Sequence, residues 1–456
     1  MRIFKPDPLL PLWLLATSEV AAFALAPVAA SLLLGVRLAP PIVATAVIFA
    51  TTNGVTMLSM GLYSRRQRAR LLGIILRVGA AIVIGSAAIG VLSYLAPPIA
   101  IERRVFLLAV ACALVAVTLL RFALDRTLGQ DAFRRRVLVY GAGRRALAIS
   151  QLRRRADLRG FKVVGYVATE GDQVTISPEQ LVDSGARLLN YCREQAIDEV
   201  VVAMDDRRRQ FPMHELLDCR LAGIDVLDII DFLERETGKV RLDVLNPSWI
   251  IFAPGFRLSP WRRRSARALD VAASFTVLLI VWPVMLLTAI AIWLEDGWRA
   301  PILYGQTRVG LEGAPFRVLK FRSMQLDAER HGPRWASKDD PRVTRVGSFI
   351  RRVRIDELPQ VLNVLAGSMS LVGPRPERPE FVAALEERVP YYRERHWVKP
   401  GITGWAQLCY PYGSTEQDAA EKLQYDLYYV KNNSLLFDLM ILLQTVEVVL
   451  LGKGAR

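Results

Sequence analysis

Two adjacent carboxylates, Asp356 and Glu357, lie within a strongly basic part of this 456-residue sequence, in the stretch RIDELPQ. The cations on either side of the pair include Arg308, Lys320, Arg322, Arg351, Arg354 and Arg375. Cations in this number indicate an anionic partner, and the glycines of YGQTRVGLEGAPF imply a backbone that approaches it closely. An Asp-Glu pair by itself usually opens a helix, where acids interact favourably with the dipole. The pair therefore has both a structural and a chemical interpretation.

The composition of the chain narrows the class of protein. A net charge of +15 suits nucleic acid, anionic lipid or a phosphorylated substrate, because all three attract Lys and Arg. The four cysteines show no CxxC spacing, so neither a zinc site nor a disulfide framework is predicted. Hydrophobic residues make up 52% of the chain, which is high for a soluble protein and indicates membrane segments.

Apolar runs near the ~20 residues that a helix needs to cross a bilayer occupy the first quarter of the chain. They cover residues 9–34, 41–63, 71–96 and 105–124. The arginine-rich loop YSRRQRARLL follows the second run, and the positive-inside rule then places both ends of the block in the cytoplasm. We predict a four-helix transmembrane region over residues 1–127. Glu19 and Arg77 lie inside these runs, where they either pair with each other or find separate partners.

The next segment, residues 128–256, alternates between predicted strands and helices. RRVLVYGAG reads as a strand that enters a glycine turn, and FKVVGYVAT, DEVVVAM and GIDVLDI follow as further strands. This βαβ order predicts a Rossmann-like α/β module. The turn GAGRRA matches a variant of the dinucleotide fingerprint, but Glu170 lies well past the second strand and is poorly placed to bind a ribose. We therefore favour a module without a cofactor over a nucleotide site.

A fifth apolar run, residues 271–294, is interrupted by Pro283. Its length is sufficient for a span, yet a fifth crossing would export the arginine-rich segment that follows it. Proline removes a backbone donor and kinks a helix. We predict a re-entrant helix, over about residues 266–295, that breaks at Pro283 and returns to the same side. The last apolar run, residues 435–451, is interrupted by polar residues and predicts an interfacial amphipathic helix.

Four further motifs occur in order after Arg262: KFRSM, DELPQ, LVGPRP and PGITGWAQ. Together they resemble the catalytic domain of bacterial polyprenyl-phosphate sugar-1-phosphate transferases, the monotopic phosphoglycosyl transferases. The predicted re-entrant-helix α/β catalytic domain covers residues 257–456, and the whole chain resembles the large form that initiates exopolysaccharide or O-antigen synthesis. The resemblance implies transfer of a sugar 1-phosphate from a UDP-sugar to undecaprenyl phosphate, with release of UMP. It also implies a multi-pass protein of the bacterial inner membrane whose catalytic domain faces the cytoplasm and whose partner is the lipid bilayer rather than nucleic acid.

The resemblance also implies roles for individual residues. Asp356 is the nucleophile that attacks the β-phosphate, and Glu357 helps to hold Mg²⁺ or to transfer a proton, so both carboxylates are metal-ligand candidates. Phosphoryl transfer between polyanions depends on charge neutralisation, for which the implied residues are Lys320, Arg322, Arg351 and Arg375. The nucleotide or substrate neighbourhood comprises Arg308, Pro374, Pro376, Thr403, Gly404 and Trp405, with packing an equal alternative for Trp405. Arg354 stands where the family commonly has Ser or Thr, and its role is open.

An enzyme of another class is the alternative interpretation. A membrane-tethered, NAD(P)-dependent nucleotide-sugar-modifying enzyme would use the Rossmann-like module for catalysis. Such enzymes need a Tyr-x-x-x-Lys pair after the glycine turn, and none occurs between Gly141 and Phe256. The transferase interpretation accounts for more of the chain. The sequence is compatible with a homo-oligomer.

Overall fold

The computed structural model describes most of the chain and divides it into two compact units, residues 1–245 and 246–456. The described residues are 10–36, 42–60, 62–63, 71–95, 102–128, 134–152, 157–158, 160–183, 185, 187–206, 211–245, 247–253, 255–256, 259–297, 300–326, 340–410, 413 and 415–450. Helix α9 (Pro247–Phe252) belongs to the second unit, whereas the sequence predicted a domain boundary after residue 256.

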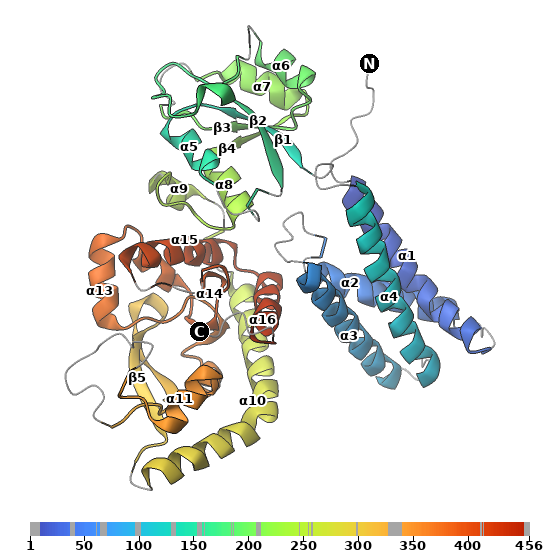
Figure 1. Ribbon diagram of the computed structural model, residues 1–456, viewed down its shortest axis with the longest axis vertical. Coiled ribbons are helices and arrows are strands. Elements are labelled where there is room, and N and C mark those ends of the chain that lie inside the picture. Colours follow the sequence, from blue (N-terminus) through green and yellow to red (C-terminus); the bar gives the residue numbers. More distant parts are fainter. Residues whose placement is uncertain are drawn as a thin grey trace. The chain divides into compact units, whose positions relative to one another are not determined.

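The first unit begins with apolar helices. They are α1 (Leu10–Leu33), α2 (Ile42–Ser59), α3 (Leu71–Leu95) and α4 (Arg103–Leu128). Helix α1 packs against α2 and α4, and α3 packs against both α2 and α4 (Figure 1). Helices α1 and α4 are long enough and apolar enough to cross a membrane, whereas the apolar helical stretches Val43–Leu58 and Arg77–Gly90 are shorter. Many of their leucine and valine side chains are exposed, as expected for a membrane protein. The number of spans stays a prediction.

A buried ion pair joins the first and last of these helices. Glu19 of α1 is fully buried, and Arg121 of α4 donates to both of its oxygens, at 2.5 and 3.0 Å. The Arg121 guanidinium also lies 5.8 Å from the centre of the Tyr63 ring. Burying a carboxylate alone in an apolar bundle would cost several kcal/mol, so this bidentate partner stabilises the packing of α1 on α4. A pairing of Glu19 with Arg77 stays a prediction.

A parallel sheet follows, in the strand order β2-β1-β3-β4. Its strands are β1 (Arg135–Tyr140), β2 (Phe161–Val167), β3 (Glu199–Val202) and β4 (Asp225–Asp228), and the helices are α5 (Arg144–Ser150), α6 (Leu188–Glu194), α7 (Met213–Leu221) and α8 (Ile229–Thr237). Residues such as Leu138, Val200 and Cys192 form its buried core. The predicted parallel α/β module is confirmed.

The second unit combines a long helix with small sheets and short helices. Its strands are the antiparallel pair β5 (Leu303–Val309) and β6 (Pro315–Phe321) and the parallel pair β7 (Ser370–Val372) and β8 (Gly401–Thr403). Its helices after α9 are α10 (Pro260–Asp296), α11 (Arg345–Arg352), α12 (Gln360–Ala366), α13 (Pro379–Arg388), α14 (Trp405–Cys409), α15 (Glu416–Asn432) and α16 (Leu435–Leu450). Val364, Val372 and Tyr425 lie in one core that these elements share.

Helix α10 is 37 residues long and continues through Pro283, where the sequence predicted a break, and Figure 1 shows it bending between its ends. Near its start, the Asp270 carboxylate accepts hydrogen bonds from the Leu371 N–H and the Ser370 hydroxyl, both at 2.9 Å. At its far end, Asp296 pairs with Arg322 at 2.7 Å. Both ends are therefore attached to the same α/β unit.

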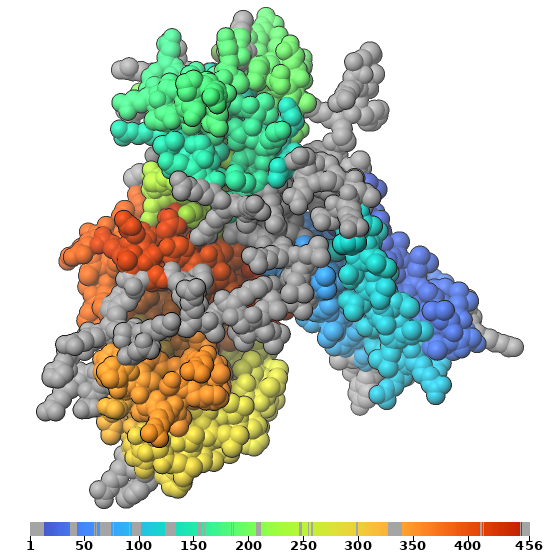
Figure 2. Space-filling view, in the orientation of Figure 1, coloured from blue at the N-terminus to red at the C-terminus, as the bar shows by residue number. Residues whose placement is uncertain are grey.

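The middle of α10 is apolar and exposed. The most exposed large side chains there include Phe275, Leu279, Ile280, Trp282, Leu286 and Leu287. Figure 2 shows this helix, in yellow, on the surface of the protein. An apolar surface this extensive indicates contact with lipid or another apolar partner.

Helix α16 packs on the same unit, with Ile441 fully buried. Asp438, which interrupts its apolar run, points inward, where it pairs with Arg262 at 2.7 Å and accepts a hydrogen bond from Tyr429 at 2.8 Å. Leu436 and Val446 are exposed. The interfacial position of α16 stays a prediction, and its acidic residue serves to attach the helix to the protein.

Candidate functional site

The acidic pair lies in a 3-10 turn, η5 (Ile355–Glu357), between α11 and α12. Arg354 enters this turn with a left-handed backbone, at φ 61°. The Asp356 side chain is buried, with 8% of its residue surface exposed. Within the residues that the structure describes, no donor lies within hydrogen-bond distance of its carboxylate. Its oxygens are not among the enclosed side-chain atoms that lack a partner, so the carboxylate is accessible to a ligand.

Glu357 has the opposite environment. Its Oε1 accepts hydrogen bonds from Lys320 Nζ of β6 at 2.9 Å and from an Arg375 guanidinium nitrogen at 2.8 Å. Arg375 follows β7, so three segments that are distant in sequence meet at one oxygen atom. Charge-assisted hydrogen bonds of this kind fix both the position and the ionisation of the acceptor.

The pKa values of the two carboxyl groups are shifted in opposite directions. Burial, followed by the neighbouring Glu357 charge, raises the pKa of Asp356, and Lys320 is the first of the cations that oppose the rise. Burial also raises the pKa of Glu357, but the Arg375 and Lys320 charges outweigh it and lower this pKa well below its usual range. Adjacent acids with divergent pKa values are typical of catalytic sites.

The segment that carries Arg375 is held by its carbonyl groups. Pro374 and Pro376 have no N–H to donate. The Pro374 carbonyl instead accepts from the Gly401 N–H at 2.9 Å, and the Pro376 carbonyl accepts from Arg308 at 3.2 Å. Arg308, Pro374 and Pro376, which the sequence assigned to the substrate neighbourhood, therefore shape the segment from which Arg375 reaches Glu357.

Several predicted site residues have other contacts in the structure. Arg322 is buried and pairs with Asp296 of α10. The Thr403 hydroxyl bonds to the Thr445 hydroxyl at 2.7 Å. Their predicted roles toward phosphate and nucleotide stay predictions.

Trp405 is also buried, and its ring packs 5.3 Å from that of Phe437, as in the packing alternative. At Gly404 an added Cβ would lie 2.1 Å from the Gly373 carbonyl oxygen, so glycine is required by a close backbone approach. The sequence missed Arg395 and Asp426, a buried pair behind Arg375, because nothing in their spacing relates them.

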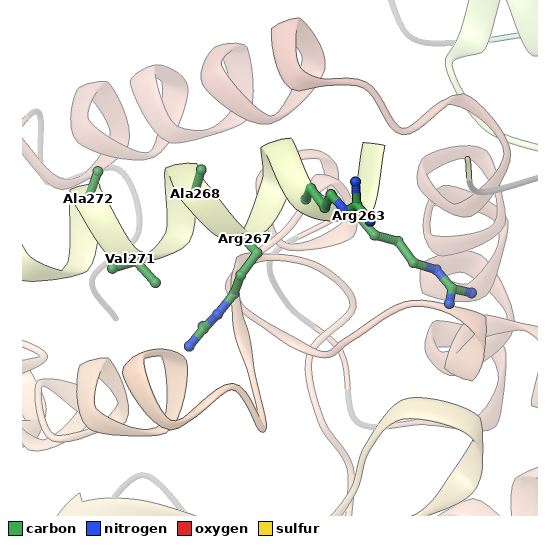
Figure 3. Close-up of a pocket in the computed structure, with 6 residues that line it drawn as sticks. Arg263, Arg267, Ala268, Val271 and Ala272 are labelled. Carbon is green, nitrogen blue, oxygen red and sulfur yellow. The ribbon is translucent and has the colours of Figure 1, made fainter. Parts of the chain in front are cut away.

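Surface shape by itself does not identify the site. A hollow of about 610 Å³ lies along the first turns of α10, away from the acidic pair. It is lined by Arg263, Arg264, Arg267, Ala268, Val271 and Ala272 (Figure 3). The Arg267 guanidinium donates to the Val364 and Leu365 carbonyls and so attaches α10 to the end of α12.

The glycine turn of the first unit is filled by the protein's own carboxylates. Asp205 accepts hydrogen bonds from the N–H groups of Arg144 at 2.9 Å and Arg145 at 3.0 Å. Asp172 accepts from the Ala142 N–H at 2.9 Å. A Cβ on Gly143 would lie 2.1 Å from an Asp205 oxygen. These N–H groups are the donors that bind a pyrophosphate in dinucleotide folds, so here an acid side chain takes the place of phosphate.

Comparison with known proteins identifies the family. Residues 261–452 match a model described as bacterial sugar transferase. A UDP-glucose:undecaprenyl-phosphate glucose-1-phosphate transferase of Xanthomonas campestris pv. campestris is 34% identical over 358 residues, which are 75% of this chain and 72% of the relative. The chain belongs to the bacterial sugar transferase family. The predicted family is confirmed, and the matched segment includes the acidic pair with Lys320, Arg351 and Arg375.

Two further relatives align with this chain over a smaller fraction of their own length. A UDP-N-acetylgalactosamine-undecaprenyl-phosphate N-acetylgalactosaminephosphotransferase of Aeromonas hydrophila is 43% identical over 239 residues, 52% of this chain and 55% of the relative. An undecaprenyl-phosphate glucose phosphotransferase of Komagataeibacter xylinus is 34% identical over 329 residues, 70% of this chain and 60% of the relative. The matches thus span little more than half the length of these two relatives.

Residues 59–216 match a second family model, described as a CoA-binding domain. CoA carries a pyrophosphate, which would need free N–H donors at the glycine turn. Asp205 and Asp172 already accept from those donors. The described residues therefore do not fit CoA bound through this turn.

Proposed function

We propose that this protein transfers a sugar 1-phosphate from a UDP-sugar to undecaprenyl phosphate and releases UMP, as the first membrane step of exopolysaccharide or related glycan synthesis. Family membership and the names of the relatives support this reaction. The observation that carries it is the acidic pair itself. Glu357 is fixed between two cations, while the adjacent Asp356 is buried without a hydrogen bond to its carboxylate from any described residue.

Asp356 is the nucleophile in this proposal. Its carboxylate oxygen attacks the β-phosphorus of the UDP-sugar, the bond between that phosphorus and the bridging oxygen breaks, and UMP leaves with the electron pair. The phosphosugar is then bound to Asp356 as an acyl phosphate. An oxygen of undecaprenyl phosphate attacks the same phosphorus and releases the Asp356 carboxylate. Covalent catalysis divides one difficult transfer between two polyanions into two easier steps.

Cations around the pair stabilise the charge that develops on phosphate. Lys320 and Arg375 contact Glu357 directly, and the Arg351 and Arg354 charges act on Asp356. Fixed charges cost no reorganisation when the reaction occurs, which is why such groups contribute strongly to phosphoryl transfer. Arg354, which replaces the Ser or Thr common in the family, adds to this positive field.

The carboxylates also fit Mg²⁺. Carboxylate oxygens are hard ligands, and Mg²⁺ is often bound by one or two of them together with substrate phosphates. Asp356 and the Oε2 atom of Glu357 accept no hydrogen bond from any described residue and would hold the ion. Bound Mg²⁺ would neutralise phosphate charge. Because Glu357 is kept ionised by two cations, it is a poor proton acceptor, and the metal role suits it better.

The geometry of α10 supports a re-entrant membrane helix. A straight helix of 37 residues would be about 55 Å long, well beyond the ~30 Å hydrocarbon core of a bilayer. If it crossed, its ends would lie on opposite sides of the membrane. Instead Asp270 and Asp296 attach both ends to one α/β unit. We place this unit on the cytoplasmic face of the bacterial inner membrane, where a UDP-sugar is accessible.

Two measurements test the proposal. Membranes that contain the protein are incubated with undecaprenyl phosphate and radiolabelled UDP-glucose, UDP-galactose or a UDP-N-acetylated sugar, and label that enters lipid identifies the substrate. Without lipid acceptor, mass spectrometry is expected to find the mass of a sugar phosphate on the peptide that contains Asp356. Failure of every UDP-sugar to label lipid would refute the proposed reaction. Release of UMP only when both substrates are present would refute the covalent step.

A further inference from the structure

The position of Arg375 depends on contacts to a short backbone segment with few donors. Proline on each side removes two N–H groups, so the segment is held through its carbonyl oxygens. The carbonyl of Arg375 itself accepts a hydrogen bond from the Arg395 guanidinium at 3.0 Å. Arg395 thus contacts the backbone of the residue whose side chain reaches Glu357 at 2.8 Å.

Arg395 is unusually well fixed. It lies in a 3-10 helix, η6 (Arg393–Trp397), and is only 5% exposed. Its guanidinium pairs with Asp426 of α15 at 2.8 Å and donates to the Tyr392 hydroxyl at 2.7 Å. It also lies 5.1 Å from the centre of the Tyr392 ring. A planar guanidinium that binds a carboxylate on one side has a defined direction for its remaining donors.

We propose that Arg395, oriented by Asp426, is a positioning residue that holds the Arg375 backbone so that the Arg375 guanidinium stays on Glu357. A buried ion pair is by itself weak evidence of stabilisation, because desolvation offsets the attraction. The Arg395 guanidinium also donates a hydrogen bond to the Arg375 carbonyl. The positions of η6 and α15 therefore affect where the Arg375 side chain lies relative to Glu357. The inference rests on the proposed function.

Substitution of Arg395 by lysine tests this role. Lysine keeps the charge beside Asp426 but lacks the fork that serves the carboxylate and the carbonyl together. We expect UMP release by the purified full-length Arg395→Lys variant to have a kcat on the order of 10- to 100-fold below wild type, as misplacement by about 1 Å produces. Because the lipid reacts after UMP has left, a slower first step is expected to lower kcat and the KM for undecaprenyl phosphate together and to leave kcat/KM for the lipid unchanged. Arg388→Lys, in an exposed pair with Glu416, is the matched control and should retain full activity.

A double-mutant cycle separates positioning from a general loss of structure. If Arg395 acts through Arg375, adding Arg395→Lys to Arg375→Ala should change kcat by less than about twofold, because the interaction is already lost. Full activity of Arg395→Lys, or losses that multiply in the double variant, would overturn the inference. Failure of the proposed function would have a different result: the wild-type protein itself would then release no UMP from any UDP-sugar.

A milder variant keeps the test decisive if Arg395→Lys does not fold. Tyr392→Phe removes one acceptor of the Arg395 guanidinium and leaves Asp426 and the Arg375 carbonyl in place. We expect kcat to fall about threefold, and no further fall when Arg375 is alanine. An unchanged kcat in Tyr392→Phe would count against the inference.

Discussion

Replacement of Asp356 by asparagine should abolish transfer while it leaves the protein folded. Asparagine has the same shape but no nucleophilic anion. Loss of a nucleophile in other enzymes lowers kcat by about 10⁴- to 10⁶-fold, which corresponds to a barrier higher by about 5.5 to 8 kcal/mol. We therefore expect neither UMP release nor a phosphosugar adduct from this variant.

The same substitution should raise the free energy of unfolding, although it abolishes activity. Burial raises the pKa of Asp356, which means that the folded state disfavours its charge. The carboxylate therefore costs stability above its folded pKa, and this cost is absent below the unfolded pKa, where the group is protonated in both states. Its removal should stabilise the protein by about 0.5 to 2 kcal/mol at neutral pH, a gain common when functional strain is relieved. For a domain of this size each kcal/mol raises Tm by roughly 2 to 4 °C.

Thermal unfolding of the purified full-length protein at pH 7.5, together with UMP release, measures both effects. If Asp356 merely opened a helix, asparagine would lower stability by about 0.3 to 1 kcal/mol through the lost dipole interaction and leave activity intact. Full activity in Asp356→Asn would refute its assignment as nucleophile. A lower Tm would refute the reasoning that its charge is disfavoured by burial.

Three further predictions concern the membrane helix, the first unit and pH. In a cysteine-free background, Glu102→Cys should react with a membrane-impermeant thiol reagent in intact cells, whereas Ala314→Cys should not; labelling of the latter would contradict a re-entrant α10. CoA and NAD⁺ at about 1 mM should shift Tm by less than about 1 °C, because Asp205 fills the glycine turn; a saturable shift would show that the turn binds nucleotide. Burial lowers the pKa of His396 to about 4, so its stabilising contribution is complete above pH 6.5 and declines as pH falls toward 4. At pH 5 the loss is about 2 kcal/mol, and His396→Gln should reduce the fall in Tm between pH 7.5 and pH 5 by about 4 to 8 °C; an equal fall in both proteins would argue against this titration.

Local sequence patterns determined much of this protein. Long apolar runs specify helices whatever their neighbours are, because a backbone in an apolar environment must satisfy its hydrogen bonds internally. Alternation of β-branched strands and short helices specified a parallel sheet in the first unit. Ordered motifs around Asp356 and Glu357 likewise identified the family, because each motif places chemistry on a short continuous segment.

Tertiary structure decided which of these groups meet. Arg121 became the partner of Glu19 because α1 and α4 pack together, and no spacing along the chain relates the two. Arg395 and Asp426 lie behind Arg375 for the same reason. Trp405, for which the sequence left nucleotide contact and packing equally open, packs against Phe437. A motif specifies the residue types that are near in sequence, whereas the side chain's partner and its ionisation depend on burial and on charges that distant segments supply. The contrast between Asp356, buried without a hydrogen bond from the described residues, and Glu357, fixed by two cations, therefore arises only when β6, η5 and the segment after β7 come together.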